Sequence, residues 1–151
     1  MEDIWNITAL VVSVLSVLLS LYALRQATTK NTSDMYLFFI SQYAKEDMKL
    51  ALRKLKDIKR GVYRLDQWES DMKNNLPKAF EYDEARRLVK YFYDTLAYMK
   101  LEKLIEARFV RLICLKKGAW LYLDTVEAME KFFDSGYDKK PYAVIRDVCE
   151  N

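Results

Sequence analysis

The chain contains 151 residues, of which 52% are hydrophobic and 31% charged, and it has a formal net charge of +3 and no histidine. The missing imidazole excludes Ser-His-Asp and Cys-His catalysis and the common His-containing zinc sites, while the small net charge argues against a nucleic-acid-binding domain. With only three glycines and two prolines, turn-rich β folds are disfavoured and long helices are favoured.

An uncharged run occupies residues 4–24. A helix of this length rises about 30 Å, which matches the hydrocarbon thickness of a bilayer. Trp5 and Tyr22 lie near its ends, where aromatic side chains prefer the headgroup level. The acidic start of the chain does not fit the basic first segment of a cleaved signal peptide. We therefore predict a transmembrane helix at about 4–24, within an anchor of residues 1–30.

Charged residues on the two sides of this run differ in sign. Glu2 and Asp3 precede it, whereas Arg25 and Lys30 follow it. Cytoplasmic flanks of membrane spans carry an excess of Lys and Arg. The sequence therefore predicts a single-pass protein of the cell membrane, with its N-terminus outside and its C-terminal domain in the cytoplasm.

Small or hydrogen-bonding residues recur along the predicted span at alternating separations of three and four. They are Asn6, Ala9, Ser13, Ser16, Ser20, Ala23 and Ala27. Transmembrane helices associate where small side chains let two backbones approach, and a 3.5-residue repeat specifies a left-handed crossing. We interpret this series as a seam for a second copy or for a different membrane protein. The alternative is that the serine hydroxyls bond back to the preceding turn of their own helix.

Hydrophobic residues at three- and four-residue spacings predict an all-α cytosolic domain over residues 33–151, a bundle of four to five helices. Lys59 and Arg60 followed by Gly61 form a typical helix stop, and Pro141 is a favourable first-turn residue. The expected helices cover about 33–60, 66–73, 81–103 and 105–115, followed by one after Gly118 and one from Pro141.

Basic residues form one stripe on the first of these helices. They are Lys45, Lys49, Arg53, Lys56 and Arg60, at separations of four, four, three and four. Such a stripe is typical of a solvated helix face, and it also suits anionic lipid headgroups at about 1 kcal/mol per residue near the surface. Lipid contact needs a bend within residues 28–34, because the screening length is only about 8 Å. A nucleic acid is not expected as a partner, since no aromatic or glycine pattern accompanies the stripe.

Acidic clusters in the sequence have no pattern of a metal or catalytic site. They are Glu81, Asp83 and Glu84, then Glu102 and Glu106, then Asp124, Glu127 and Glu130. Di-iron bundles need histidine beside glutamate, and this chain has no histidine. Asp83 and Glu84 instead suit ordinary helix pairing with Arg86 and Arg87. We therefore predict no catalytic residue, no cofactor and no metal.

The two cysteines, Cys114 and Cys149, are widely separated in the sequence. Small secreted domains use denser sets, so this pair favours a reducing compartment without a disulfide. Cys114 lies on an apolar face and is expected to act as a small hydrophobic residue. The 11 tyrosines are expected to serve mainly in packing.

A hydrophobic pattern follows the span and the long charged helix, at Leu88–Phe92, Leu104–Ile105, Trp120 and Phe132–Phe133. This arrangement resembles a family of uncharacterised bacterial single-span membrane proteins with a short helical cytosolic domain. The resemblance implies a bacterial context and the same architecture, but no activity.

These patterns favour a membrane-anchored assembly or tethering subunit, not an enzyme, that acts through protein–protein contacts in the membrane and the cytosol. Its expected partners are the lipid bilayer and, through the span, either further copies or another membrane protein. The alternative is an oligomerising effector that perturbs the bilayer, in which the seam serines of four or more copies line a narrow pore.

Overall fold

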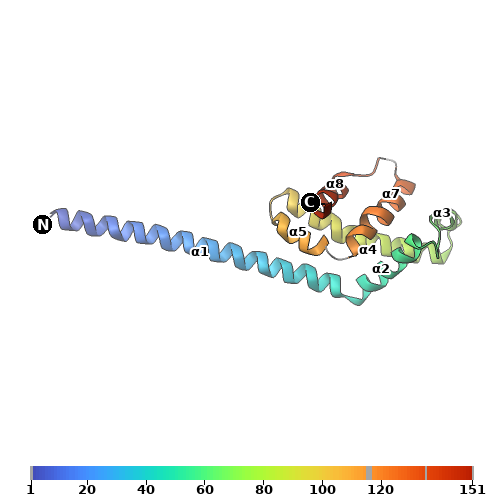
Figure 1. Cartoon of the computed structure of the whole chain (residues 1–151), viewed down its shortest axis with the longest axis horizontal. Helices are drawn as coiled ribbons and strands as arrows, with labels where there is room; N and C mark the ends of the chain where they lie inside the picture. The colour runs from blue at the N-terminus through green and yellow to red at the C-terminus, as the bar shows by residue number, and fades with distance from the viewer. Residues whose placement is uncertain (1, 115–116, 135, 151) are drawn as a thin grey trace. The chain divides into compact units, whose positions relative to one another are not determined.

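The computed structural model describes the backbone of residues 2–114, 117–134 and 136–150, and the side chains of residues 15–24, 26, 33–114, 117–134 and 136–150. Every regular element in these ranges is a helix, which confirms the all-α prediction (Figure 1). The chain divides into two compact units, Met1–Phe39 and Ile40–Asn151, which are described separately.

The first unit is formed by a single long helix. Helix α1 (Glu2–Ala44) is unbroken through the predicted span and through residues 28–34, so the bend that lipid contact by the basic stripe would require is not found there. Within the described part of the chain, no helix combines the length and the apolar character that crossing a membrane requires. The side chains of residues 4–14, where the predicted span begins, lie outside the described ones.

The helix predicted over residues 33–60 is interrupted at Lys45. The backbone of Lys45 is extended (φ −60°, ψ 148°), and this residue is the N-cap of α2 (Glu46–Lys59). Glu46 and Asp47 occupy the first turn of α2, where the helix dipole stabilises carboxylates. This start signal prevails over the apolar periodicity that continues from α1 into α2.

Helix α2 buries one face and ends at a glycine, as the sequence predicts. Met48, Ala51, Leu55 and Ile58 are all buried. Full burial of a side chain such as Leu55 contributes about 1.5–3 kcal/mol to stability. Gly61 has a φ of 74°, which glycine adopts at little cost, and its amide donates to the carbonyl of Ile58 at 3.0 Å.

Helix α4 (Pro77–Leu101) is the centre of the second unit. It contacts α2, α3 (Leu65–Lys73) and α8 (Lys140–Glu150), and Figure 1 shows α2 and α8 on opposite sides of it. Helix α4 begins at Pro77 rather than at the predicted residue 81. Proline suits the first turn of a helix, where its missing N–H leaves no hydrogen bond unmade.

The second unit holds more helices than the four to five predicted. Helix α5 (Ala107–Cys114) is followed by α6 (Gly118–Leu121), a π-helix (Tyr122–Val126) and α7 (Glu127–Phe133). The sequence predicts α6, the π-helix and α7 as one element, because a single π turn interrupts the apolar periodicity too little to be recognised.

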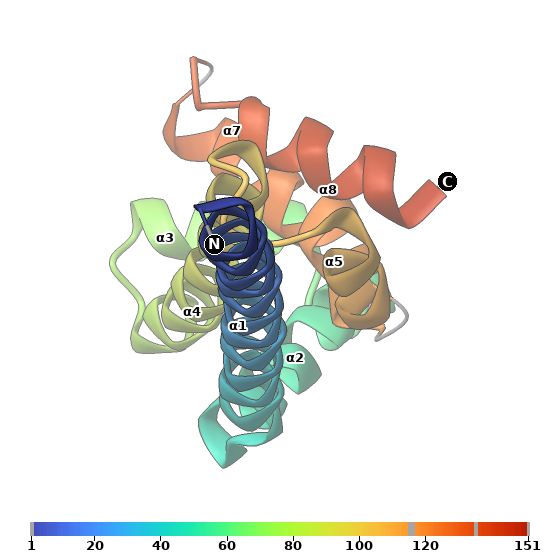
Figure 2. The same cartoon turned by 90° about the vertical axis from the view of Figure 1, so that its left-hand side faces the viewer.

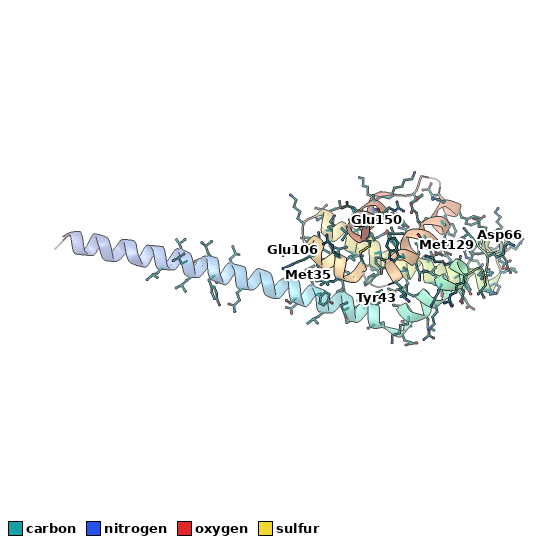
Figure 3. All side chains as sticks on the ribbon, in the orientation of Figure 1. Met35, Tyr43, Asp66, Glu106, Met129 and Glu150 are labelled. Carbon is teal, nitrogen blue, oxygen red and sulfur yellow. A yellow bond between two sulfur atoms is a disulfide. The ribbon has the colours of Figure 1, made fainter. Side chains whose placement is uncertain are left out.

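Aromatic rings fill the centre of the second unit. The ring of Tyr122 stacks between those of Tyr93 (centroids 5.0 Å apart) and Tyr142 (4.5 Å), and so joins the π-helix to α4 and α8. Met129, which is labelled in Figure 3, is also fully buried. Offset-stacked pairs of this kind contribute about 0.5–1.5 kcal/mol beyond the area that they bury. The predicted packing role of tyrosine is therefore confirmed for these three residues.

Cys114 and Cys149 form a disulfide between the ends of α5 and α8, so the prediction of unpaired cysteines is wrong. Their Cα atoms are 5.4 Å apart, although 35 positions separate them in the sequence. Helices α5 and α8 lie side by side (Figure 2). A contact made by tertiary packing leaves no mark in cysteine spacing. Disulfides are typical of oxidising compartments, so the cysteines do not support the reducing compartment inferred from the sequence.

Candidate functional site

Three members of the predicted basic stripe line a groove in the second unit. Lys49, Arg53 and Lys56 are exposed on α2, on a different face from the one that this helix buries. Lys59 of the same helix and Lys117, just before α6, also line it. The groove has a volume of about 530 Å³, which is within the usual range for ligand sites. We call it the basic groove.

The apolar part of the basic groove comes from Leu52, Trp120 and Leu121. Leu121 is buried, whereas its neighbour Trp120 remains 43% exposed. A partly exposed indole ring can still stack on a ligand and donate a hydrogen bond from its N–H group. The groove thus combines an apolar surface with several cations, an arrangement suited to an amphipathic anion.

Gly118 allows α6 to approach the end of α1 within the second unit. Its amide donates to the hydroxyl of Tyr43 at 3.2 Å (Tyr43 is labelled in Figure 3). A Cβ atom at this position would lie 2.7 Å from the Tyr43 hydroxyl and 2.8 Å from the hydroxyl of Tyr93. Both distances are too short for a carbon and an oxygen that are not bonded. A side chain at this position would therefore require at least one of the two tyrosines to move.

Burial raises the pKa of both of these hydroxyls. For Tyr43, loss of hydration has the largest effect, and the hydrogen bonds of the Gly118 amide and of Tyr93 act in the opposite direction. For Tyr93, burial raises the pKa well above its usual value, and the neighbouring Tyr43 adds to the increase. Both phenols are therefore neutral at physiological pH and add no negative charge to the basic groove.

The cations of the basic groove differ in how they are already compensated. Lys59 pairs with Asp124 of the π-helix at 2.5 Å, and Lys49 pairs with Glu46 at 3.5 Å. Among the described residues, the groove cations without an ion-pair partner are Arg53, Lys56 and Lys117. Exposed ion pairs contribute little, so even the two paired lysines remain available to an incoming anion.

The ends of the predicted basic stripe lie outside the basic groove. Lys45 caps the start of α2 and Arg60 caps its end, and neither lines the groove. Sequence reasoning missed Lys59, which is not part of the predicted stripe. It also missed Lys117 and Trp120, because only the fold brings α6 beside α2.

A second charged cluster is buried between α4 and α7. Arg86 pairs with Asp83 at 2.7 Å and with Glu130, and its guanidinium carbon lies 4.7 Å from the centre of the Phe133 ring. Asp83 also pairs with the exposed Arg87 at 2.7 Å, so the predicted pairing within α4 is confirmed for Asp83. The members of this cluster neutralise one another away from solvent, and we interpret it as a contact that holds α7 to α4.

The acidic residues of the third predicted cluster bind separate partners. Glu127 accepts hydrogen bonds from Tyr137 at 2.6 Å and from Arg146 at 2.8 Å. Asp124 pairs with Lys59, and Glu130 with Arg86. In the part of the chain that the structure describes, no group of three or more His, Cys, Asp or Glu residues is placed to hold a metal ion.

The predicted seam of α1 is described only in part. Its members with side chains outside the described ones are Asn6, Ala9, Ser13 and Ala27. Ser16, Ser20 and Ala23 are exposed, and the hydroxyl of Ser20 donates to the carbonyl of Ser16 at 2.8 Å. The hydroxyl of Ser20 is thus bonded within its own helix, and the seam stays a prediction.

Comparisons with protein-family models, with curated proteins and with solved structures give no match to this chain. The resemblance to bacterial single-span membrane proteins therefore stays a prediction. The function of the basic groove has to be inferred from its own chemistry.

Proposed function

We propose that this chain is a non-enzymatic tethering subunit, anchored in the cell membrane by α1, whose second unit holds a partner protein in the basic groove. The observation that carries the proposal is the presence of Arg53 and the exposed Trp120 in one groove with apolar walls. Protein interfaces draw most of their affinity from Trp, Tyr and Arg side chains set in such pockets.

Membrane attachment is supported by the composition of α1. Residues 4–24 carry no charge, and the apolar side chains of Leu15, Leu18 and Leu19 are 54%, 56% and 67% exposed. A run of exposed apolar side chains is typical of helices that contact lipid or another helix. The charges that flank the run favour an outside N-terminus and a cytoplasmic second unit, whereas the Cys114–Cys149 disulfide favours the opposite orientation.

The same helix offers a route to self-association or to a partner span through the small residues of its seam. The alternative, a pore through the bilayer, would need several serine hydroxyls to face water. The hydroxyl of Ser20 is already bonded to the carbonyl of Ser16, which gives a pore no support.

Membrane attachment is tested by alkaline extraction of membranes from cells that make the full chain. We expect the protein to remain in the membrane pellet and to be released by deletion of residues 4–24. Release of the full chain at high pH would contradict a spanning anchor.

Partner binding is tested by a photoreactive benzophenone amino acid in place of Trp120, which keeps an aromatic ring in the groove. We expect a cross-linked species of defined mass in membranes. It should disappear when Arg53→Glu and Lys56→Glu reverse two groove charges, and persist with Arg111→Glu on the exposed face of α5. The same amino acid in place of Tyr91, which is 74% exposed on α4, is the control for non-specific capture. Equal cross-linking from both positions would contradict the proposal.

A further inference from the structure

We propose that the occupant of the basic groove is an acidic amphipathic helix of a partner protein, laid along α2 with one bulky apolar residue against Trp120. This inference deepens the tethering function proposed above and rests on it. The spacing of the groove cations and the apolar surface beside them indicate the chemistry of the partner.

The cations of α2 form a row and not a point. Lys49, Arg53 and Lys56 are separated by four and three residues on one helix, so the row is about 10 Å long at 1.5 Å per residue. A single carboxylate or phosphate can hydrogen-bond only the cations at one place in this row. A helix with acidic residues at the same separations has the same rise, and each carboxylate then faces one cation.

The opposite wall of the groove adds a cation and the apolar contact. Lys117 precedes α6 and Trp120 lies within it, so a helix placed beside α2 is held from both sides. Trp120 and Leu52 add apolar surface to the groove beside the α2 row and Lys117. An amphipathic helix that lays its apolar face in a groove and its charged face against the rim uses both features.

The position of Gly118 keeps this wall in place. Its amide is bonded to Tyr43, and a side chain at this position would require either α6 or the tyrosine hydroxyls to shift. The distance between Trp120 and the α2 row is therefore set by buried packing and is available before a partner binds. Pre-formed sites lose less entropy on binding than sites that must be assembled.

A nucleic acid fits these observations less well. Proteins that bind single strands stack successive bases on several aromatic side chains. Of the two aromatic residues that line the groove, Tyr43 is partly buried with its hydroxyl engaged by Gly118, and Trp120 is the more exposed. A lipid headgroup carries its charge at one point and would leave most of the row uncompensated. The test below therefore also measures binding of a nucleic acid and of anionic lipid.

The test uses the full chain in nanodiscs of zwitterionic phosphatidylcholine and follows binding by fluorescence anisotropy. The probe is a labelled helical peptide with glutamates at i, i+4 and i+7 and one leucine and one tryptophan on the same face. Its isomer has the same composition but has the glutamates spread around the helix. We expect the first peptide to bind at least about tenfold more tightly than its isomer. Only in the first peptide can all three glutamates face the row of cations on α2.

Variants of the protein then locate the site. Arg53→Gln and Lys56→Gln should each weaken the first peptide by about two- to fivefold, the range of an exposed ion pair. Trp120→Ala should weaken it by about 30-fold, as for an aromatic residue at the centre of an interface. Arg111→Gln, an exposed cation on α5 and outside the groove, should change nothing.

Three results would overturn the assignment. One is equal binding of the two peptide isomers, and another is no binding of either. The third is that an oligothymidine or phosphatidylserine vesicles bind more tightly than the acidic peptide, and that Arg53→Gln weakens this binding. The groove would then be a site for nucleic acid or lipid. If cross-linking from position 120 captures a protein in membranes while the acidic peptide fails, only the chemistry of the occupant is wrong. If both fail, the tethering function fails as well.

Discussion

The amide of Gly118 donates a hydrogen bond at 3.2 Å to the hydroxyl of Tyr43, a residue 75 positions earlier in the chain. This contact brings α6 to the end of α1 within the second unit, and it defines one side of the basic groove. A Cβ atom at Gly118 would lie 2.8 Å from the hydroxyl of the buried Tyr93, so no other side chain fits there without movement.

Gly118→Ala should destabilise the second unit, although alanine is the better helix former by about 1 kcal/mol. The new methyl group would lie 2.7 Å from the Tyr43 hydroxyl, and overpacking of this kind costs about 1–3 kcal/mol. Urea denaturation measures the change. Tyr43→Phe in the same chain removes one of the two clashing oxygens and should recover part of the loss. Tyr43→Phe alone, with Gly118 in place, is the control for loss of the hydrogen bond without the clash. A stabilised Gly118→Ala protein would contradict the described contact.

Arg86→Met should destabilise the protein by about 3–5 kcal/mol, because the change leaves Asp83 and Glu130 buried without their shared cation. Methionine keeps most of the volume and the contact with the Phe133 ring. Arg87→Met is the matched control, since Arg87 pairs with Asp83 from the exposed side of α4 and should matter by less than about 1 kcal/mol. Thermal unfolding of both variants measures the difference, and equal losses would show that the buried position of Arg86 is irrelevant.

Cys149→Ser should lower the stability of the oxidised protein by about 4 kcal/mol, the loop entropy expected from the 35-residue separation that the disulfide closes. In the presence of a reductant, the variant and the natural chain should be nearly equal. Unfolding measured with and without dithiothreitol tests both statements. A variant that is equally stable under oxidising conditions would show that the disulfide contributes nothing.

The same two cysteines report on membrane orientation. With the second unit in the cytoplasm, glutathione should keep Cys114 and Cys149 reduced, and both should be alkylated when cells are lysed directly into a maleimide reagent under denaturing conditions. Protection of both thiols until a reductant is added would place the unit on the oxidising side of the membrane and reverse the orientation predicted from the flanking charges.

The stability of the second unit should fall above about pH 10. Burial, with the hydrogen bond to Glu127 as the next cause, raises the pKa of Tyr137 to about 12. The phenol has a pKa of about 10 in the unfolded chain. The contribution of Tyr137 to the free energy of unfolding is therefore fully present below pH 10 and is lost as the pH rises through 12. Tyr137→Phe should flatten part of this decline, and Tyr91→Phe, at an exposed ring, should not. Denaturation at a series of alkaline pH values provides the measurement.

Ser16→Leu should weaken association of α1 in a membrane reporter assay, because a branched side chain would separate two backbones that approach at the seam. Hydrogen bonds between transmembrane helices average only about 0.6 kcal/mol, so loss of the hydroxyl should matter less than added volume. Val17→Leu adds bulk one residue away from the seam and should leave association unchanged. Equal effects of the two changes would mean that the series of small residues has no role in association.

Local signals in the sequence predicted much of the fold. The spacing of Met48, Ala51, Leu55 and Ile58 identified the buried face of α2, and Gly61 identified its end, because both depend on residues within a few positions of each other. The interruption at Lys45 was missed, since the apolar spacing continues across it. The stripe on α2 likewise predicted three of the groove cations without any sign of what they face.

The sequence by itself determined the helical class, the position of the uncharged run and the amphipathic faces, which follow from nearest neighbours along a helix. Only the tertiary structure decided that Cys114 meets Cys149, that Gly118 meets Tyr43, and that Trp120 lies in one groove with Arg53. These contacts join residues far apart in the chain. They depend on how α4 orients the helices on its two sides, and that orientation is set by the packing of the whole core.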